Sequence, residues 1–457
     1  MDPFILSIVL YISIMFIATV GIDRIYRQTK LGFFVSNRSA PDWQVAFSAA
    51  ASWMYVLVIV MTAQFTVNKG PGGVFWFLLP SVLTIMYFGL LGHQLLTKMP
   101  QGFTFSEFIA HRYNNDKLTK FYQLLHIAAA IYAIAANLTG FGMITEYVSS
   151  SFGYPLIVGI LGCTILSYSL WGGVKASLRT DTIQMILVLF VAIVFSAVAV
   201  TQIGGLDLVY NNWVAARPNS IFSTEFILDP GILLALLFMG SIMADNGAYQ
   251  KIYSLGTKEK IVKTYLTAGV ILMVAYAGLT ILSATIFSLP IPITEPRLAS
   301  IQVTEHVIGY IGVVIFVLMV LAKASSASDT ALNSAGSVVA NDFFPYWDQL
   351  TVSRITMVIM MLIGVGLAAL KIDLWILITT FGVFRMLAVM PTLYALFSDR
   401  IIKTDTVFWS MLITGAGGLA ITLGKIPVDK LLLSTVMLVI PGLALAYQTF
   451  RKPTLNA

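Results

Sequence analysis

Long apolar runs separated by short polar segments dominate this chain. A helix that crosses a bilayer needs about 20 mostly apolar residues, and thirteen stretches approach or exceed that length. They are residues 4–22, 43–67, 73–97, 118–145, 155–172, 181–204, 228–251, 261–288, 304–338, 352–370, 373–397, 406–424 and 430–449. No alternation with a period of two residues runs through them, so the pattern predicts helices and argues against barrel strands.

The composition agrees with this pattern. Apolar residues make up 58% of the 457 positions and charged residues only 11%, whereas soluble domains carry about 25% charged residues. A soluble enzyme and a disordered chain are both excluded on this ground. The single cysteine, Cys163, allows neither an internal disulfide nor a cysteine metal cluster. We therefore expect an all-α polytopic membrane protein in which residues 1–457 form one transmembrane domain.

Lysine and arginine placement predicts the orientation of the chain. With the N-terminus outside, most of the 27 basic residues fall in segments that face the cytoplasm. This favours an odd number of spans, a cytoplasmic C-terminus and an inner or plasma membrane. The net charge of +6 then reflects loops that face anionic lipid, and we expect no nucleic-acid partner. No basic segment precedes residues 4–22, so we expect a retained helix, not a signal peptide.

Five ionisable residues fall inside or at the start of predicted spans, where such residues usually mark function. Asp181 opens the sixth span, Asp245 lies in the seventh, Lys323 and Asp329 lie in the ninth, and Arg385 lies in the eleventh. The structural alternative is that these side chains pair with each other or reach the membrane surface, and Asp181 fits that alternative best.

The ninth span carries the densest polar cluster. Ala322, Ser325, Ser326 and Asp329 follow the i, i+3, i+4, i+7 spacing and therefore share one helix face. Hydroxyl, carboxylate and carbonyl oxygens are the ligands that hard cations prefer. The face is a candidate cation site, although small residues also serve close helix packing in lipid.

The order of the spans suggests an inverted repeat. The second and seventh spans start from opposite sides of the membrane and are five spans apart, as in many secondary transporters. Asp245-Asn246-Gly247 predicts a break in the seventh span, because glycine frees the backbone and both polar side chains can cap it. The second span has no Gly or Pro between residues 43 and 69, so local signals predict no break there.

Three regions together resemble the sodium:solute symporters, a family of proline, sugar, sialic acid, pantothenate and monocarboxylate carriers. The matching segments are Gly172–Ala176 with Thr180–Gln184, Ser325–Asp329 with Leu332–Ser334 and Asn341-Asp342, and Pro391–Phe397 with Asp399-Arg400. Each segment alone is weakly diagnostic, but their order and spacing are more specific. The span number and orientation also fit, so the resemblance covers essentially the whole chain.

The resemblance implies a leucine-transporter-like fold and two sodium sites. The inverted repeats would span residues 42–204 and 228–398, with helix 1 and a loop in 1–41 and helices 12 and 13 with a tail in 405–457. It places one sodium site between helices 2 and 9, and some members hold a second sodium nearer the cytoplasm. The ligands would be Ala51, Met54, Ala322, Ser325 and Ser326 at the first site, and Asp181, Ser325, Ser326, Ser328 and Asp329 at the second.

Two residues depart from the family pattern. Asp329 stands where members with the second site have serine, which would make that site more acidic. Lys323 lies beside the first site, where the family usually has a small or apolar residue. Its ammonium could occupy the sodium position or repel the ion.

The family's solute pocket lies among helices 2, 3, 4, 7 and 11. Residues at matching positions that could contact a solute are Trp53, Tyr55, Phe75, Tyr132, Asn137, Asp245, Asn246 and Arg385. A guanidinium binds both oxygens of a carboxylate, so Arg385 favours a carboxylate or amino-acid-like solute. The alternatives are that the aromatic residues only pack and that Arg385 pairs with Asp245.

These observations predict sodium-coupled symport of a small organic solute by alternating access, with sodium as the coupling ion and no other cofactor. One alternative is a sodium-independent or proton-coupled carrier in which Lys323 replaces the ion. Another is a solute sensor, although the short segment after residue 449 argues against a fused kinase but not against a separate signalling partner. An enzyme is not expected, because the four histidines are scattered and form no catalytic or metal-binding spacing. The sequence does not predict an oligomeric state.

Overall fold

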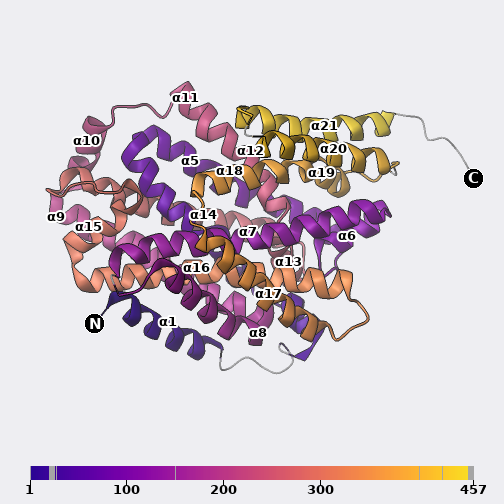
Figure 1. Ribbon diagram of the computed structural model, residues 1–457, viewed down its shortest axis with the longest axis horizontal. Coiled ribbons are helices and arrows are strands. Elements are labelled where there is room, and N and C mark those ends of the chain that lie inside the picture. The colour runs from indigo at the N-terminus through magenta and orange to yellow at the C-terminus, as the bar shows by residue number, and fades with distance from the viewer. Residues whose placement is uncertain are drawn as a thin grey trace, which may run out of the picture.

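The computed structural model of the chain describes residues 2–19, 26, 28–149, 151–400, 402–424 and 426–450. These residues are helical wherever they are regular, and no strand occurs among them. Most helices run along the long axis of the molecule, and α1 begins toward one end of it while α21 ends toward the other (Figure 1). The all-helical prediction is confirmed, while the number of membrane crossings and the side on which each terminus lies stay predictions.

The helices follow one another with short connections, and their order matches the order of the predicted stretches. The elements that matter below are α1 (Pro3–Thr19), α4 (Asp42–Trp53), α5 (Val56–Lys98), α6 (Phe105–Tyr113), α7 (Asp116–Val148), α8 (Tyr154–Phe190), η2 (Val191–Phe195), α9 (Ser196–Ile203), α10 (Leu206–Ala216), α11 (Thr224–Phe226), η3 (Ile227–Ile232), α12 (Leu233–Met243), α13 (Asn246–Leu255), α14 (Ile261–Ala284), α15 (Ala299–Ile308), α16 (Tyr310–Val338), η6 (Val339–Phe343), α17 (Gln349–Ala369), α18 (Leu374–Arg385), η7 (Met386–Ala388), α19 (Val389–Phe397), α20 (Asp405–Leu423) and α21 (Lys430–Phe450).

Nine helices among the described residues are long and apolar enough to cross a membrane. The sequence predicts more spans partly because α5 and α8 each contain parts of two predicted stretches. Each of these helices is kinked at one glycine with positive φ, Gly70 at 65° and Gly173 at 54°. A Cβ at Gly173 would lie 2.5 Å from the carbonyl oxygen of Phe33, so only glycine fits this kink.

The second and the seventh predicted spans are each broken into two helices. The break between α12 and α13 falls at Ala244 and Asp245, as the sequence predicts, and the Asp245 carboxylate accepts a hydrogen bond from the Gly247 N–H at 2.8 Å. The break between α4 and α5 falls at Met54 and Tyr55, where no local signal predicts one. It is capped from another helix.

Asn137 of α7 provides that cap. Its side-chain oxygen accepts a hydrogen bond from the Val56 N–H at 2.9 Å, and its amide nitrogen donates to the Ala133 carbonyl at 2.7 Å. The first N–H groups of a helix have no partner within the helix, and lipid offers none. The break in the second span therefore depends on a residue 81 positions away in the chain.

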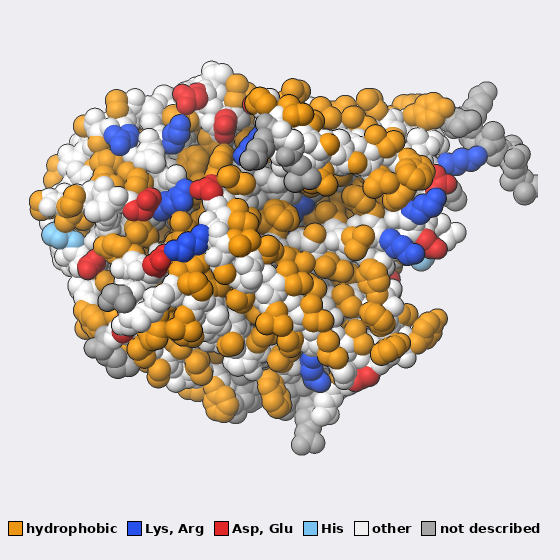
Figure 2. All heavy atoms as spheres, in the orientation of Figure 1, with side chains coloured by type: hydrophobic (Ala, Val, Ile, Leu, Met, Phe, Trp, Pro, Cys, Tyr) orange, Lys and Arg blue, Asp and Glu red, His pale blue; other side chains and the backbone are white. Residues whose placement is uncertain are grey.

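Helix α16 is the centre of the molecule. It is buried along almost its whole length, and it packs against α7, α8, α17 and α1 (Figure 1). Many of its residues are alanine, serine or glycine, which let neighbouring helices approach closely. Figure 2 shows hydrophobic side chains across the middle of one face and charged groups mainly toward its two ends, as expected for a protein surrounded by lipid.

We expect Asn137→Ala to destabilise the protein through the α4–α5 break. The change leaves the buried Val56 N–H without its acceptor, which costs about 1–3 kcal/mol. The measurement is the midpoint of thermal unfolding in detergent, with Asn212→Ala as control because Asn212 bonds only a partly buried serine, Ser288. Equal midpoints for the Asn137 variant and the wild type would show that the cap does not support the break.

Candidate functional site

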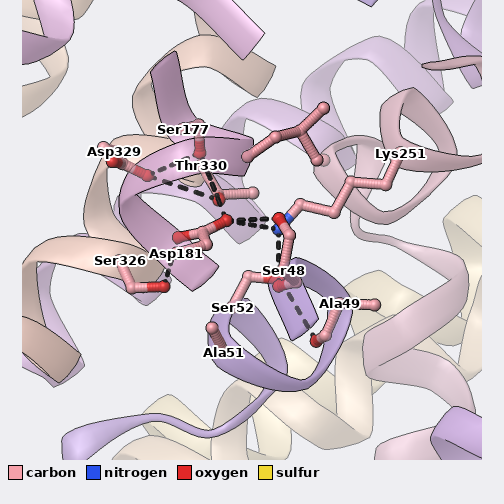
Figure 3. A network of polar contacts seen from close by, with 12 residues as sticks. Ser48, Ala49, Ala51, Ser52, Ser177, Asp181, Lys251, Ser326, Asp329 and Thr330 are labelled. Carbon is pink, nitrogen blue, oxygen red and sulfur yellow. Dashed lines mark hydrogen bonds and ion pairs between the residues drawn. The ribbon is translucent and has the colours of Figure 1, made fainter. Parts of the chain in front are cut away.

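The ends of α4 and α13 meet α8 and α16 in a cluster of buried polar side chains. Figure 3 shows Ser48 from α4, Lys251 from α13, two residues from α8 and two from α16 directed toward one another. We call this cluster the buried charge network, and it consists of Ser48, Ser177, Asp181, Lys251, Ser326 and Asp329. All six residues are buried.

Asp181 is the most fully bonded member of the network. Its Oδ2 forms an ion pair with the ammonium of Lys251 at 3.0 Å and accepts a hydrogen bond from the Ser48 hydroxyl. Its Oδ1 accepts from the Ser326 hydroxyl at 2.5 Å. The Lys251 ammonium also donates to the Ser48 carbonyl at 2.9 Å. The carboxylate thus joins three helices, and its charge is matched by a lysine of the protein itself.

Asp329 is less completely satisfied. Its Oδ1 accepts hydrogen bonds from Ser177 at 2.9 Å and from Thr330 at 3.4 Å. Its Oδ2 is buried and has no hydrogen-bond partner among the described residues, and the same holds for the hydroxyls of Ser325 and Ser328. Ser177 also contacts Asp181 at 3.4 Å, so the two aspartates that the resemblance assigns to a second cation site lie around one serine.

Two of the residues expected to form the first sodium site have other partners here. The Lys323 ammonium donates a hydrogen bond to the Ala51 carbonyl, and the Ser326 hydroxyl donates to Asp181. Met54 is buried at the break between α4 and α5. A carbonyl that accepts from an ammonium is a poor ligand for a second cation. The donor set therefore does not suit sodium while Lys323 carries its charge.

Sequence reasoning identified Lys323 but missed Lys251. It placed Lys251 at the last position of the predicted stretch 228–251, and therefore at the membrane surface. The break at Asp245 restarts the helix as α13, which continues to Leu255 and carries Lys251 into the interior. The Asp245-Asn246-Gly247 break signal could have shown that the span extends further.

A small central cavity lies beside the network. About 10 Å³ of it is open to the centre of a water molecule, which is close to the minimum needed to hold one. Its lining residues are Ser52, Tyr55, Ala129, Ala130, Ala133, Ser241, Asp245, Ala327, Thr330, Ala331 and Arg385. The cavity in this conformation is too small for an organic solute, so a solute would bind in a more open state.

Three of the predicted solute-binding residues, Tyr55, Asp245 and Arg385, line this cavity. Arg385 is buried, lies over the ring of Tyr132 at 4.3 Å and donates to the Ala129 carbonyl at 3.5 Å. Tyr132 in turn packs against Tyr55. Asp245 lines the same cavity, and no ion pair joins it to Arg385 among the residues the structure describes.

The remaining predicted residues, like Tyr132, lie outside the cavity lining. Trp53 donates from its indole to the carbonyl and hydroxyl of Ser81, and Asn137 caps α5. Asn246 accepts from the Phe105 N–H at 2.8 Å, and Phe75 is 41% exposed. Each of the three buried or partly buried residues has a structural partner that the sequence could not indicate, because the partner comes from a distant helix.

Two larger cavities are lined partly by charged residues. One of about 470 Å³ is lined by residues such as Lys69, Asp229 and Asp373, and Arg297 bonds Asp373 there at 2.8 Å. The other, of about 690 Å³, is lined by residues including Glu107 and Asp342.

Comparison with known proteins identifies the relatives of this chain. A model of the sodium:solute symporter family matches residues 33–414. The chain is 22% identical over 355 residues to a probable urea active transporter 1 of Schizosaccharomyces pombe, a match that covers 69% of this chain and 52% of the relative. It is 21% identical over 357 residues to the urea-proton symporter DUR3 of Oryza sativa subsp. japonica, covering 70% and 48%. The chain thus spans about half the length of these relatives.

A solved structure has the same fold along almost the whole chain. It is the substrate-bound outward-open state of a Na⁺-coupled sialic acid symporter, with a TM-score of 0.76 and 14% identity. The match covers 97% of this chain and 96% of that protein. At this identity the likeness shows the fold alone, and the fold is the leucine-transporter type that the sequence resemblance implies.

The Asp181–Lys251 pair gives a prediction about stability. Removing one partner of a buried ion pair leaves an uncompensated charge and costs about 3–5 kcal/mol. We expect Lys251→Met and Asp181→Asn each to lower the midpoint of thermal unfolding strongly, and the double variant to recover part of the loss. As a control, Lys371→Gln removes a surface partner of Glu146, where the pair is half exposed and worth little. Additive losses in the double variant would argue against the pair.

Proposed function

Because this chain belongs to the sodium:solute symporter family, we propose that it is a small-solute symporter in which Lys323 takes the place of the coupling sodium. The family and the fold of the solved neighbour support solute symport and argue against an enzyme. The proposal that Lys323 replaces sodium goes beyond what the family supports. It rests on one observation, the hydrogen bond from the Lys323 ammonium to the Ala51 carbonyl.

The physical argument is electrostatic. Two unit charges held about 4 Å apart, as two cations on one carbonyl would be, repel each other by about 4 kcal/mol at an effective dielectric constant near 20. Sodium would therefore bind poorly between α4 and α16 while Lys323 is protonated. Sodium and the Lys323 ammonium would have the same structural role, because each links the end of α4 to the middle of α16.

The proposed coupling ion is a proton. A sodium ion must leave its site to remove its charge, whereas a lysine removes its charge by releasing a proton. Protonated Lys323 holds α4 against α16 in one state of the carrier, and its deprotonation releases them in the other. Moving one charge through 100 mV supplies about 2.3 kcal/mol. Proton and solute must then raise each other's affinity by the same factor. The urea-proton symporter relative is named for this kind of coupling.

A second candidate is sodium coupling at Asp329. The observation in its favour is the group of buried oxygens without a partner among the described residues, namely Asp329 Oδ2 and the hydroxyls of Ser325 and Ser328. Oxygen donors of this kind suit a hard cation. The sodium-coupled prediction from the sequence would then hold at the second site and not at the first. A solute sensor is the remaining alternative, since it would bind a solute without moving it.

The Lys323 proposal predicts how sodium affects stability. The measurement is thermal unfolding in detergent, in sodium against choline at equal ionic strength. We expect no sodium-specific effect on the wild type and a sodium-specific rise in Lys323→Ala, because the alanine vacates the Ala51 carbonyl. A ligand at 100 times its dissociation constant adds about 2.7 kcal/mol to the folded state. Lys323→Arg is the matched control, since it keeps the positive charge and should stay insensitive to sodium.

Other outcomes separate the alternatives. A sodium-specific rise in the wild type that disappears in Asp329→Asn would overturn the Lys323 proposal in favour of sodium at Asp329. Uptake into liposomes distinguishes a carrier from a sensor: a pH gradient should drive solute uptake by the wild type but not by Lys323→Arg. Solute binding without uptake under either a proton or a sodium gradient would indicate a sensor.

A further inference from the structure

Two opposite charges line the central cavity without forming an ion pair with each other. Arg385 comes from α18, and Asp245 comes from the break between α12 and α13. Both side chains contribute to the lining of the cavity, whose space is otherwise bordered by hydroxyl, tyrosyl and alanyl groups. Charged groups that face a shared space at the membrane centre are costly unless something compensates them.

Both charged groups have unused hydrogen-bonding capacity. A guanidinium has five N–H donors, and the only hydrogen bond from Arg385 to the described residues is the 3.5 Å contact with the Ala129 carbonyl. Asp245 uses Oδ1 to accept from the Gly247 N–H, which leaves further acceptor positions on the carboxylate. Stacking on Tyr132 holds the guanidinium in one plane.

The hydroxyls that line the cavity offer a ligand mainly hydrogen-bond acceptors and few donors. The Ser52 and Ser241 hydroxyls donate to backbone carbonyls of the preceding turn, at 3.4 and 2.8 Å. The Thr330 hydroxyl contacts Asp329 Oδ1 at 3.4 Å as a donor. A hydroxyl that donates its proton to the protein presents only lone pairs to a ligand. The cavity therefore offers many acceptors and one concentrated set of donors, at Arg385.

From these observations we propose that the cavity binds a compact solute that has no net charge and is rich in N–H donors, with its oxygen acceptor on Arg385 and its N–H groups on Asp245. The proposal deepens the proposed function by naming the solute class of the same carrier. It also refines the sequence-based preference for a carboxylate or amino-acid-like solute. A simple carboxylate would satisfy Arg385 but repel Asp245, and a polyamine would do the reverse.

The net charge of the site explains why a solute without net charge is favoured. Arg385 and Asp245 sum to zero, so a neutral dipolar solute leaves the cavity neutral, whereas an anion or a cation brings one uncompensated charge into the membrane centre. The cavity is narrow in this conformation, so a compact solute requires the least opening of its walls. Urea and the zwitterion glycine both have this chemistry, because each carries several N–H donors and an oxygen acceptor.

The experiment is equilibrium binding of radiolabelled urea, glycine, acetate and spermidine to the detergent-purified full chain at millimolar concentrations. We expect saturable binding of urea or glycine and none of acetate or spermidine. The urea and glycine arms separate a neutral amide from a zwitterion. Asp245→Asn and Arg385→Gln should each weaken binding about 30-fold or more. Lys371→Gln and Glu146→Gln, which remove surface charges of opposite sign, should leave it unchanged.

A change of specificity separates recognition from misfolding. Asp245→Asn gives the cavity a net positive charge, so this variant should gain binding of acetate. Arg385→Gln gives it a net negative charge, so this variant should gain binding of methylammonium. A variant that has merely lost its fold gains nothing.

The inference is overturned if acetate or spermidine binds the wild type while urea and glycine do not, or if none of the four binds. Because binding needs no ion gradient, its result is independent of the coupling ion. Binding of a neutral solute together with sodium stabilisation of the wild type would uphold the solute class and reject the Lys323 proposal.

Discussion

The lipid bilayer offers no partner for an exposed peptide group or an uncompensated charge. Every irregular feature at the centre of this molecule has to meet that constraint from within the protein. The break between α4 and α5 is capped by Asn137 of α7, and the break between α12 and α13 is capped by Asp245 within its own turn. The negative charge of Asp181 is matched by Lys251 of α13. The broken helices and the buried charges therefore support one another.

The sequence predicted those features whose cause is local. Twenty-residue apolar runs specify helices on their own, and Asp245-Asn246-Gly247 contains both the flexible residue and the cap of its break. The spacing of Ser325, Ser326 and Asp329 specifies a helix face wherever the helix lies. These predictions needed no knowledge of neighbouring helices.

Features with a distant cause could not be predicted in this way. Nothing near Met54 indicates a break, because the residue that caps α5 comes from α7. Asn137, Asn246 and Trp53 were predicted to contact a solute because they occupy positions that match the family's pocket. Each bonds a backbone or side-chain group of another helix in this structure, and its contact with a solute stays a prediction. Lys251 was missed because its burial follows from the break before it and from the position of Asp181 in α8.

The proposed cation region and the proposed solute cavity share the same two helix segments. On α4, the Ala51 carbonyl accepts from Lys323 and the next residue, Ser52, lines the cavity. On α16, Asp329 belongs to the buried charge network and the next residue, Thr330, contacts Asp329 and also lines the cavity. Under the proposed mechanism, a change of charge at Lys323 alters the contact between α4 and α16 one residue away from the solute. Coupling would then need no long pathway, because the helix segments that hold the cation also form the walls of the cavity.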